Sequence, residues 1–364
     1  MSVEIKVLKK EDISELQRLF EKTPVLKQHD PFVTGSLDEF KWQFFNDNYQ
    51  SSVYVIAYDA ARDELAATLS ALYFPMKTPD GEVCQSIKPE DALVNIKALV
   101  RHKDHDFLKE LLDLIESKSE LMNIKFLWGF TYAANSFERL GFSRCFSSKQ
   151  GTYVIRPVSA YKHLVSLNTS NGVKQKIQIA GLTLMSYLKS IVNTRNYKEI
   201  ICKEVELNDI NEETLLGFLA PDLYSIHLNK DFLNWRIVEN SSMLKYSILQ
   251  FEDHSHKIIA CFIYSQKEGR VFFVEQFLFH PDLSVAFKER ISRRALQHLK
   301  SKGAAIVRAM GFDHNKVNKE ELGILNNAGF IFINRGIPFI FKSLDNKVKP
   351  ENVYLSRLNT QGTY

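Results

Sequence analysis

The sequence has few cysteines, and none of them is placed to bind a metal. The four cysteines, Cys84, Cys145, Cys202 and Cys261, lie far apart in the 364-residue chain. No two of them form a Cys-x-x-Cys pair, and no histidine stands beside one at the spacing of metal ligands. Zinc sites need closely spaced thiolate or imidazole ligands, and disulfides are rare in the cytoplasm. We therefore expect reduced thiols, no metal site and a cytoplasmic location.

Long apolar runs are also missing. No uninterrupted apolar run reaches the ~18 residues that a membrane-spanning helix needs. Residues 1–12 alternate apolar and polar side chains like a first strand and lack the apolar core of a signal peptide. The net charge of +4 is too small to indicate a nucleic-acid partner. A chain of this length exceeds what one hydrophobic core usually serves, so we expect about two domains.

Acidic residues are absent from one long stretch, residues 151–198. Within it, residues 173–192 place apolar side chains at helical spacing, with an apolar face wider than a solvent-facing helix needs. We expect a helix packed between the two domains. The alternative is a basic amphipathic helix that lies on an anionic membrane as a peripheral contact. The stretch contains seven positively charged residues: Arg156, Lys162, Lys174, Lys176, Lys189, Arg195 and Lys198.

What the chain does contain is one unit used twice. The stretch 128–142 begins Trp-Gly-Phe and ends Arg-Leu-Gly-Phe, and a thinner version of it returns at 311–330. In each copy an apolar run typical of a buried strand meets Gly-Phe, then a short helix, then a second Gly-Phe. Gly141 and Gly329 can adopt the left-handed backbone angle that ends a helix. Two such closures after two such strands predict an internal repeat.

The order of elements around these closures is the same in both halves. Each half runs helix, hairpin, strand, helix, strand, short helix, strand, with Trp42 and Trp235 in equivalent segments. We expect core packing for both tryptophans. In the first half we place the central strand at residues 92–100. The pattern predicts an α/β fold with two tandem mixed-sheet domains, at 1–155 and 201–364, joined by a basic helical linker at 156–200.

This order and the closing motif resemble the GNAT (GCN5-related N-acetyltransferase) acyltransferase superfamily. Its closing helix reads roughly Asn-x-x-Ala-x-x-x-Tyr-x-x-x-Gly-Phe, and residues 137–142, Phe-Glu-Arg-Leu-Gly-Phe, resemble its end. The resemblance implies a tandem GNAT protein that binds acetyl-CoA or another acyl-CoA. In this family a central strand splays from its neighbour to admit the pantetheine arm, and a glycine-rich loop at the next helix cradles the pyrophosphate.

The sequence departs from the family at both functional motifs. The glycine positions of the phosphate loop fall on Asp106 and Leu108 in the first copy, and the second copy offers Arg290 and Ser292. An aspartate at this position would repel phosphate. The tyrosine that protonates the departing CoA thiolate has Phe137 and Leu325 as its counterparts, and neither side chain can donate a proton.

Three other residues are candidates for the catalytic roles. Glu275 lies among aromatic residues of a strand, where a charge is costly unless it is paired or faces a cleft, and His280 ends that strand. Either could take the proton of an acceptor amine, and Tyr132 is the nearest hydroxyl to the first closing helix. The alternatives are structural roles without catalysis: Glu275 and His280 would face outward from the strand, and Tyr132 would pack its ring at an interface.

Cofactor contacts are expected in the first copy, which has the better-preserved closing helix. The backbone groups of Ala98 and Leu99 are predicted to pair with the pantetheine amides. Arg101 and Lys103 partly offset the phosphate-repelling Asp104 and Asp106, and Asn135 lies near the closing motif but out of the family's register.

Two functions remain open. The first is acyl-CoA-dependent N-acylation of an amine, with an amino sugar or other envelope precursor implied as the acceptor by tandem members of the family. The second is a GNAT-derived binding or scaffolding protein without catalysis, which the absent glycines and tyrosines favour. The oligomeric state is not indicated by the sequence.

Overall fold

A computed structural model describes residues 3–26, 37–46, 49, 52–119, 122–166, 172–192, 200–240, 244–267 and 270–360. The chain divides into two compact units. Unit 1 comprises Met1–Cys145 and Phe339–Lys349, and unit 2 comprises Phe146–Pro338 and Pro350–Tyr364. Strand β13 (Ile331–Ser343) therefore has its first part in unit 2 and its last part in unit 1. The domain limits at 155 and 200 do not coincide with these unit limits and stay a prediction.

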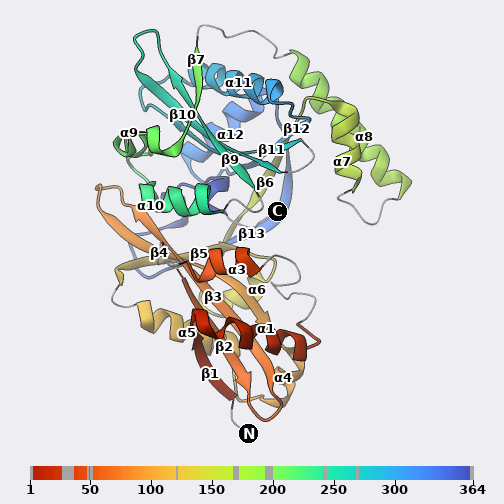
Figure 1. The fold of residues 1–364 in the computed structure, drawn as a ribbon, viewed down its shortest axis with the longest axis vertical. Helices are drawn as coiled ribbons and strands as arrows, with labels where there is room; N and C mark the ends of the chain where they lie inside the picture. The colour runs from red at the N-terminus through yellow and green to blue at the C-terminus, as the bar shows by residue number, and fades with distance from the viewer. Residues whose placement is uncertain are drawn as a thin grey trace. The chain divides into compact units, whose positions relative to one another are not determined.

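Unit 1 is a mixed sheet with helices packed against it (Figure 1). Its core gathers apolar residues of the central strands and of the helix at 107–119, including Leu69, Ile87, Leu111 and Leu127. In chain order its elements are β1 (Val3–Leu8), α1 (Ile13–Lys22), α3 (Leu37–Phe44), β2 (Ser52–Asp59), β3 (Glu64–Lys77), β4 (Val83–Val94), α4 (Ile96–Arg101), α5 (Phe107–Ser119), β5 (Ile124–Phe130) and α6 (Ala134–Glu138).

The strands of unit 1 lie in the order β1-β2-β3-β4-β5-β13. All neighbours are antiparallel except β4 and β5, which run parallel. The β4–β5 pairs end at Ile87 and Leu127, although β4 continues to Val94 and β5 to Phe130. The two strands therefore part in the middle of the sheet.

Unit 2 repeats this architecture around its own core, which includes Phe262, Phe277, Leu296 and Val307. In chain order its elements are β6 (Ser143–Val154, from Phe146), α7 (Pro157–Ser166), α8 (Val173–Val192), β7 (Ile201–Val205), α9 (Glu212–Gly217), β8 (Ser225–Ile226), α10 (Lys230–Leu233), a π-helical turn (Asn234–Glu239), β9 (Lys245–Glu252), β10 (Ile258–Lys267), β11 (Val271–Phe279), α11 (Val285–Ser301), β12 (Ile306–Gly311), α12 (Lys316–Ala328) and β13.

Read from its N-terminal edge strand, the order of unit 2 is β7-β9-β10-β11-β12-β6, which matches the order of unit 1 read from β1. Its parallel pair is β11 and β12, and the pairing ends at Val274 and Ala309 while β11 continues to Phe279. The closing glycines stand at equivalent places, after α6 and after α12, with φ of +88° at Gly141 and +121° at Gly329. The predicted α/β repeat of two mixed-sheet folds is confirmed.

The predicted strand at 92–100 is wrong. The central strand β4 ends at Val94, and α4 begins at Ile96. The cause is Asn95, whose side-chain oxygen accepts hydrogen bonds from the backbone N–H groups of Lys97 (3.0 Å) and Ala98 (3.3 Å). A side chain that caps a helix in this way accepts hydrogen bonds from two backbone N–H groups. In a strand, such N–H groups would instead donate to a neighbouring strand.

Residues 173–192, expected to lie buried between the domains, are assigned to unit 2. The residues do form a helix, α8, but Leu184 in its apolar pattern is 56% exposed. The helix belongs to unit 2, where it packs on α7 and on β6 through small polar side chains. Arg195 and Lys198, counted in the same basic stretch, lie outside the described residues.

Candidate active site

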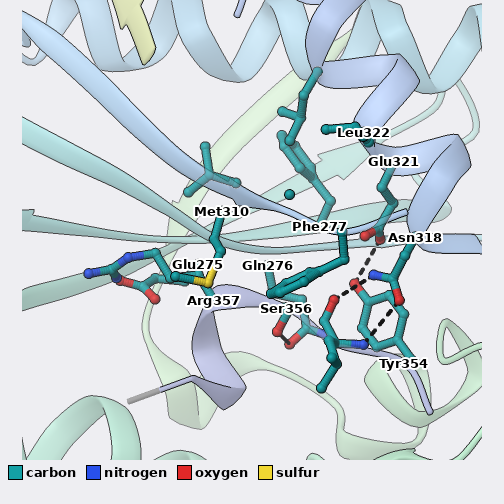
Figure 2. Close-up of a pocket in the computed structure, with 15 residues that line it drawn as sticks. Glu275, Gln276, Phe277, Met310, Asn318, Glu321, Leu322, Tyr354, Ser356 and Arg357 are labelled. Carbon is teal, nitrogen blue, oxygen red and sulfur yellow. Dashed lines mark hydrogen bonds and ion pairs between the residues drawn. The ribbon is translucent and has the colours of Figure 1, made fainter. Parts of the chain in front are cut away.

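The opening between β11 and β12 in unit 2 is filled by the chain's own C-terminal segment. Figure 2 shows Tyr354, Ser356 and Arg357 beside the β11 residues Glu275, Gln276 and Phe277 and the α12 residues Asn318, Glu321 and Leu322. The space that remains is about 30 Å³. This volume accommodates about one water molecule and no thioester.

The C-terminal segment is fixed by paired hydrogen bonds. The side chain of Asn318 donates to the Leu355 carbonyl (2.6 Å) and accepts from the Leu355 N–H (3.2 Å), as a strand partner would. The Val353 carbonyl accepts from Asn315 Nδ2 (2.8 Å) and contacts His314 Nε2 at 2.8 Å. Residues 353–360 are buried along their whole length. A ligand in this opening would have to displace a well-bonded segment.

Glu275 lies in this filled opening and is 1% exposed. Its Oε1 accepts hydrogen bonds from Arg357 Nη1 and from the Ser265 hydroxyl, and its Oε2 has no partner among the described residues. The Arg357 guanidinium also lies 4.1 Å from the centre of the Phe273 ring. Glu275, expected to take a proton from an acceptor amine, is therefore buried and paired with Arg357, and its catalytic role stays a prediction.

Glu321 and Tyr354 form a second buried pair in the same place. The Tyr354 hydroxyl donates to Glu321 Oε1 at 2.7 Å. Burial raises the pKa of the Glu321 carboxyl to about 8 and raises the pKa of the Tyr354 hydroxyl well above its usual range. Both side chains are therefore mainly neutral at pH 7. An uncharged hydrogen-bonded pair can hold the C-terminal segment in place, but it offers no charge to a substrate.

The two remaining predicted catalytic residues lie in different units, His280 in unit 2 and Tyr132 in unit 1. His280 follows β11, packs its ring against Phe218 and lies 3.3 Å from the Lys257 ammonium through Nε2. Tyr132 is 75% exposed on the loop after β5. Asn135 is exposed on α6. Trp235 is 1% exposed, as core packing requires, and Trp42 is half-buried.

In unit 1 charged residues of β4 follow the point where its pairing with β5 ends. Trp128 of β5 donates from Nε1 to the Ser86 hydroxyl (3.0 Å), beside the last pairs of the two strands. Beyond that point Lys88, which is 2% exposed, forms an ion pair with Glu90, and its ammonium lies 6.0 Å from the Trp128 ring. Asp91 follows directly.

Asp91 has the features of a proton acceptor. It stands at a bulge of β4, where the register with β3 shifts between Thr68 and Ser70, and its φ is +48°. Its carboxylate Oδ2 is buried and has no hydrogen-bond partner among the described residues. Burial, with the neighbouring Glu90 charge, raises the pKa of Asp91 to about 7. Bulges and strained backbone of this kind concentrate at functional sites.

Sequence reasoning missed Asp91 for a definite reason. The Pro-Glu-Asp run at 89–91 is unfavourable in a strand, so the sequence does not favour a central strand that passes through it. The available signal was the pair of adjacent carboxylates before the apolar run that follows. The two carboxylates indicate a site only when Glu90 and Asp91 are recognised as part of the central strand β4.

The predicted cofactor contacts of unit 1 are largely engaged by the protein itself. Ala98 and Leu99 lie in α4, where their N–H groups bond Asn95, so the backbone pairing predicted for them is wrong. Arg101 forms ion pairs with Asp59 (3.1 Å) and Glu64 (3.0 Å). Lys103 is exposed in the turn before α5.

The N-terminus of α5 is where the family's pyrophosphate loop would end. There Asp106 Oδ1 accepts the backbone N–H of Lys109 at 3.3 Å. A helix N-terminus favours an anion, and here a carboxylate of the chain supplies it. Among the described residues no group of three His, Cys, Asp or Glu side chains could hold a metal ion.

The strand order and the parted parallel pair recur in both units, so the chain carries one mixed α/β fold twice. No protein-family model matches the chain, and no curated protein sequence matches it. Solved structures do. A probable N-acyltransferase from Enterococcus faecalis, described as a conserved protein of unknown function, matches with a TM-score of 0.58 at 12% identity, over 95% of this chain and 73% of that one.

Two further structures name the fold. A GCN5-related N-acetyltransferase from Anabaena variabilis matches with a TM-score of 0.57 at 10% identity, over 94% of this chain and 74% of that one. A tandem GNAT protein from the clavulanic acid biosynthesis pathway matches with a TM-score of 0.56 at 9% identity, over 94% of this chain and 98% of that one. The protein has the tandem GNAT fold. Identities this low speak for the fold alone.

Proposed function

We propose that the protein transfers an acyl group from acyl-CoA to an amine, and that unit 1 carries the reaction. The observation that carries this proposal is Asp91, which lies on the parted strand β4 and has one buried, unpartnered carboxylate oxygen and a pKa of about 7. A base of this pKa matches the operating pH of general base catalysis. The corresponding opening of unit 2 holds the C-terminal segment.

The reaction assigns one task to each group. The acceptor amine loses a proton to Asp91, and its nitrogen attacks the thioester carbonyl carbon. The C–N bond forms, the C–S bond breaks, and CoA leaves as a thiolate. Because Phe137 and Leu325 replace the family's tyrosine, the thiolate takes its proton from water or from Tyr132, which is 75% exposed. An amino sugar or another envelope precursor remains our proposed acceptor.

Acyl-CoA binding in unit 1 should be weak. The Asp106 carboxylate occupies the N-terminus of α5, and the glycines that would let backbone N–H groups close on a pyrophosphate are absent. We therefore expect a dissociation constant in the upper micromolar range or above, with about 1.4 kcal/mol lost for each tenfold. Calorimetric titration with acetyl-CoA and longer acyl-CoAs measures it.

Asp91→Asn tests the catalytic assignment. Asparagine keeps the shape of the side chain and removes its basicity, so release of CoA from acetyl-CoA with hexosamine acceptors should fall about 100-fold or more. In the wild-type protein, kcat/KM should rise with pH through about 7, because Asp91 must lose its proton to act. Asp113→Asn, an exposed carboxylate of the same unit, is the matched control and should leave the rate unchanged. Normal turnover by Asp91→Asn contradicts the assignment.

A second function is favoured by a different observation. A filled opening in unit 2 and a carboxylate at the phosphate site of unit 1 are what a GNAT-derived binding or scaffolding protein would show. Failure of every acyl-CoA to bind at millimolar concentration favours this function over acyl transfer.

A further inference from the structure

Helix α8 packs against unit 2 with its polar side and turns its apolar side outward. Thr183, Ser186 and Ser190 are buried. The Ser186 hydroxyl accepts from the Val154 N–H (3.0 Å) and donates to the Thr152 carbonyl (3.1 Å), which fixes the helix to β6. Near the end of the helix, Lys189 donates to Asn326 (2.8 Å) and to the Phe330 carbonyl (2.9 Å). The orientation of α8 is therefore held by specific bonds.

The outward side of α8 is apolar along its length. Surface helices normally bury their apolar stripe and expose their charges, so this helix has the reverse arrangement. The spacing of its exposed apolar residues places them on one side of the helix. We call this the α8 apolar face; its members, each between 45% and 75% exposed, are Val173, Ile177, Leu184, Met185, Leu188 and Ile191.

A groove extends the α8 apolar face toward α12 and β13. It has a volume of about 750 Å³ and is lined on the helix side by Met185 and Leu188. Leu322, Ile331 and Phe332 supply apolar surface on the other side. An exposed apolar helix face that continues into a groove is the kind of surface at which proteins bind partners.

The charges of the sequence stretch that contains α8 are of one sign. Residues 151–198 contain seven Lys and Arg and no Asp or Glu, whereas the whole chain carries a net charge of only +4. The rest of the chain is therefore net acidic. Among the described members, Arg156, Lys162, Lys174 and Lys176 are exposed. A second copy of the chain would bring two such cationic stretches together, so the charge pattern disfavours self-association and fits an anionic surface.

We propose that the α8 apolar face docks the protein on an anionic lipid membrane. The helix lies in the plane of the headgroups, with its apolar side chains reaching the acyl boundary and the cations of α7 and α8 beside the lipid phosphates. Among the described residues no helix is long and apolar enough to cross a membrane, so the contact is peripheral. Together with the acyl transfer proposed above, on which this step rests, such docking places the protein at a membrane-bound acceptor.

Vesicle co-sedimentation of the full chain tests the proposal. The protein should bind vesicles that contain phosphatidylglycerol, bind phosphatidylcholine vesicles more weakly, and lose the difference at high salt. The double variant Leu184→Asp/Leu188→Asp should bind anionic vesicles about tenfold less or worse, because it places two charges in the apolar layer. Its thermal unfolding should match the wild type, since both side chains are more than half exposed.

Two controls keep the result interpretable. Ile96→Asp replaces an apolar residue that is 67% exposed on α4 and should bind vesicles normally. Lys174→Glu/Lys176→Glu reverses two cations without altering the apolar face and should reduce binding to anionic vesicles only. Absence of binding by the wild-type protein, or undiminished binding by Leu184→Asp/Leu188→Asp, overturns the proposal. A wild-type dimer that this variant dissociates, without vesicle binding, overturns it in favour of a second copy as the partner.

Discussion

At the scale of single residues, the ion pair of Glu275 and Arg357 gives a structural explanation for a residue whose sequence context suggests a catalytic base. Glu275 has the sequence context of a catalytic base, a carboxylate among aromatic residues of a strand. The structure places a guanidinium against it, and that guanidinium comes from a segment far along the chain. A charge that is costly in apolar surroundings can be explained by a partner as well as by a substrate, and sequence spacing does not distinguish the two.

Glu275→Gln should therefore act mainly on stability. Glutamine keeps the shape of the side chain but leaves the Arg357 guanidinium buried without its anion, so the free energy of unfolding should fall by about 3 kcal/mol. Urea unfolding measures the change. The double variant Glu275→Gln/Arg357→Met removes both charges and should recover at least half of the loss. If Glu275→Gln unfolds at the wild-type urea concentration, the ion pair does not contribute to folding as described.

At the scale of elements, β4 and α8 show what the sequence could and could not reveal. The two Gly-Phe closures can be recognised in the sequence because Gly141 and Gly329 adopt positive φ, a backbone angle that few other residue types adopt readily. The end of β4 cannot be recognised in the same way, because a single helix cap, the Asn95 side chain, decides whether the next residues form a strand or a helix. For α8 the periodicity gave the helix and its apolar side correctly. It could not say which side faces the protein, since that depends on hydrogen bonds made by Ser186 to a distant strand.

The orientation of α8 gives a prediction for the element as a whole. Ser186→Ala leaves the buried Val154 N–H without its acceptor and should lower the free energy of unfolding by about 1 to 3 kcal/mol. Leu184→Ala on the opposite, exposed side should change it by less than about 0.5 kcal/mol. Thermal or urea unfolding of the two variants side by side is the measurement. The reverse order of effects would mean that α8 packs through its apolar face.

At the scale of the whole molecule, the tandem GNAT fold was predictable from the order of elements, because a repeat shows itself twice. The difference between the two units was not. Residues 353–360 fill the opening of unit 2 because they form hydrogen bonds with Asn318, Gln276 and Glu321. No sequence motif indicates any of these three pairings. Likewise, Asp91 gains its raised pKa only from its surroundings. The chain is thus two copies of one fold in which, on our account, one copy retains the reaction.

Amide hydrogen exchange with and without acetyl-CoA, and with longer acyl-CoAs, tests that assignment most directly, because it reports where a ligand binds. On our account, acyl-CoA slows exchange in unit 1, at residues 88–94 of β4 and in the first turn of α5, and leaves β11 and the start of α11 unchanged. Protection of β11 and α11 instead, or no protection anywhere at millimolar acyl-CoA, would contradict the assignment of acyl transfer to unit 1.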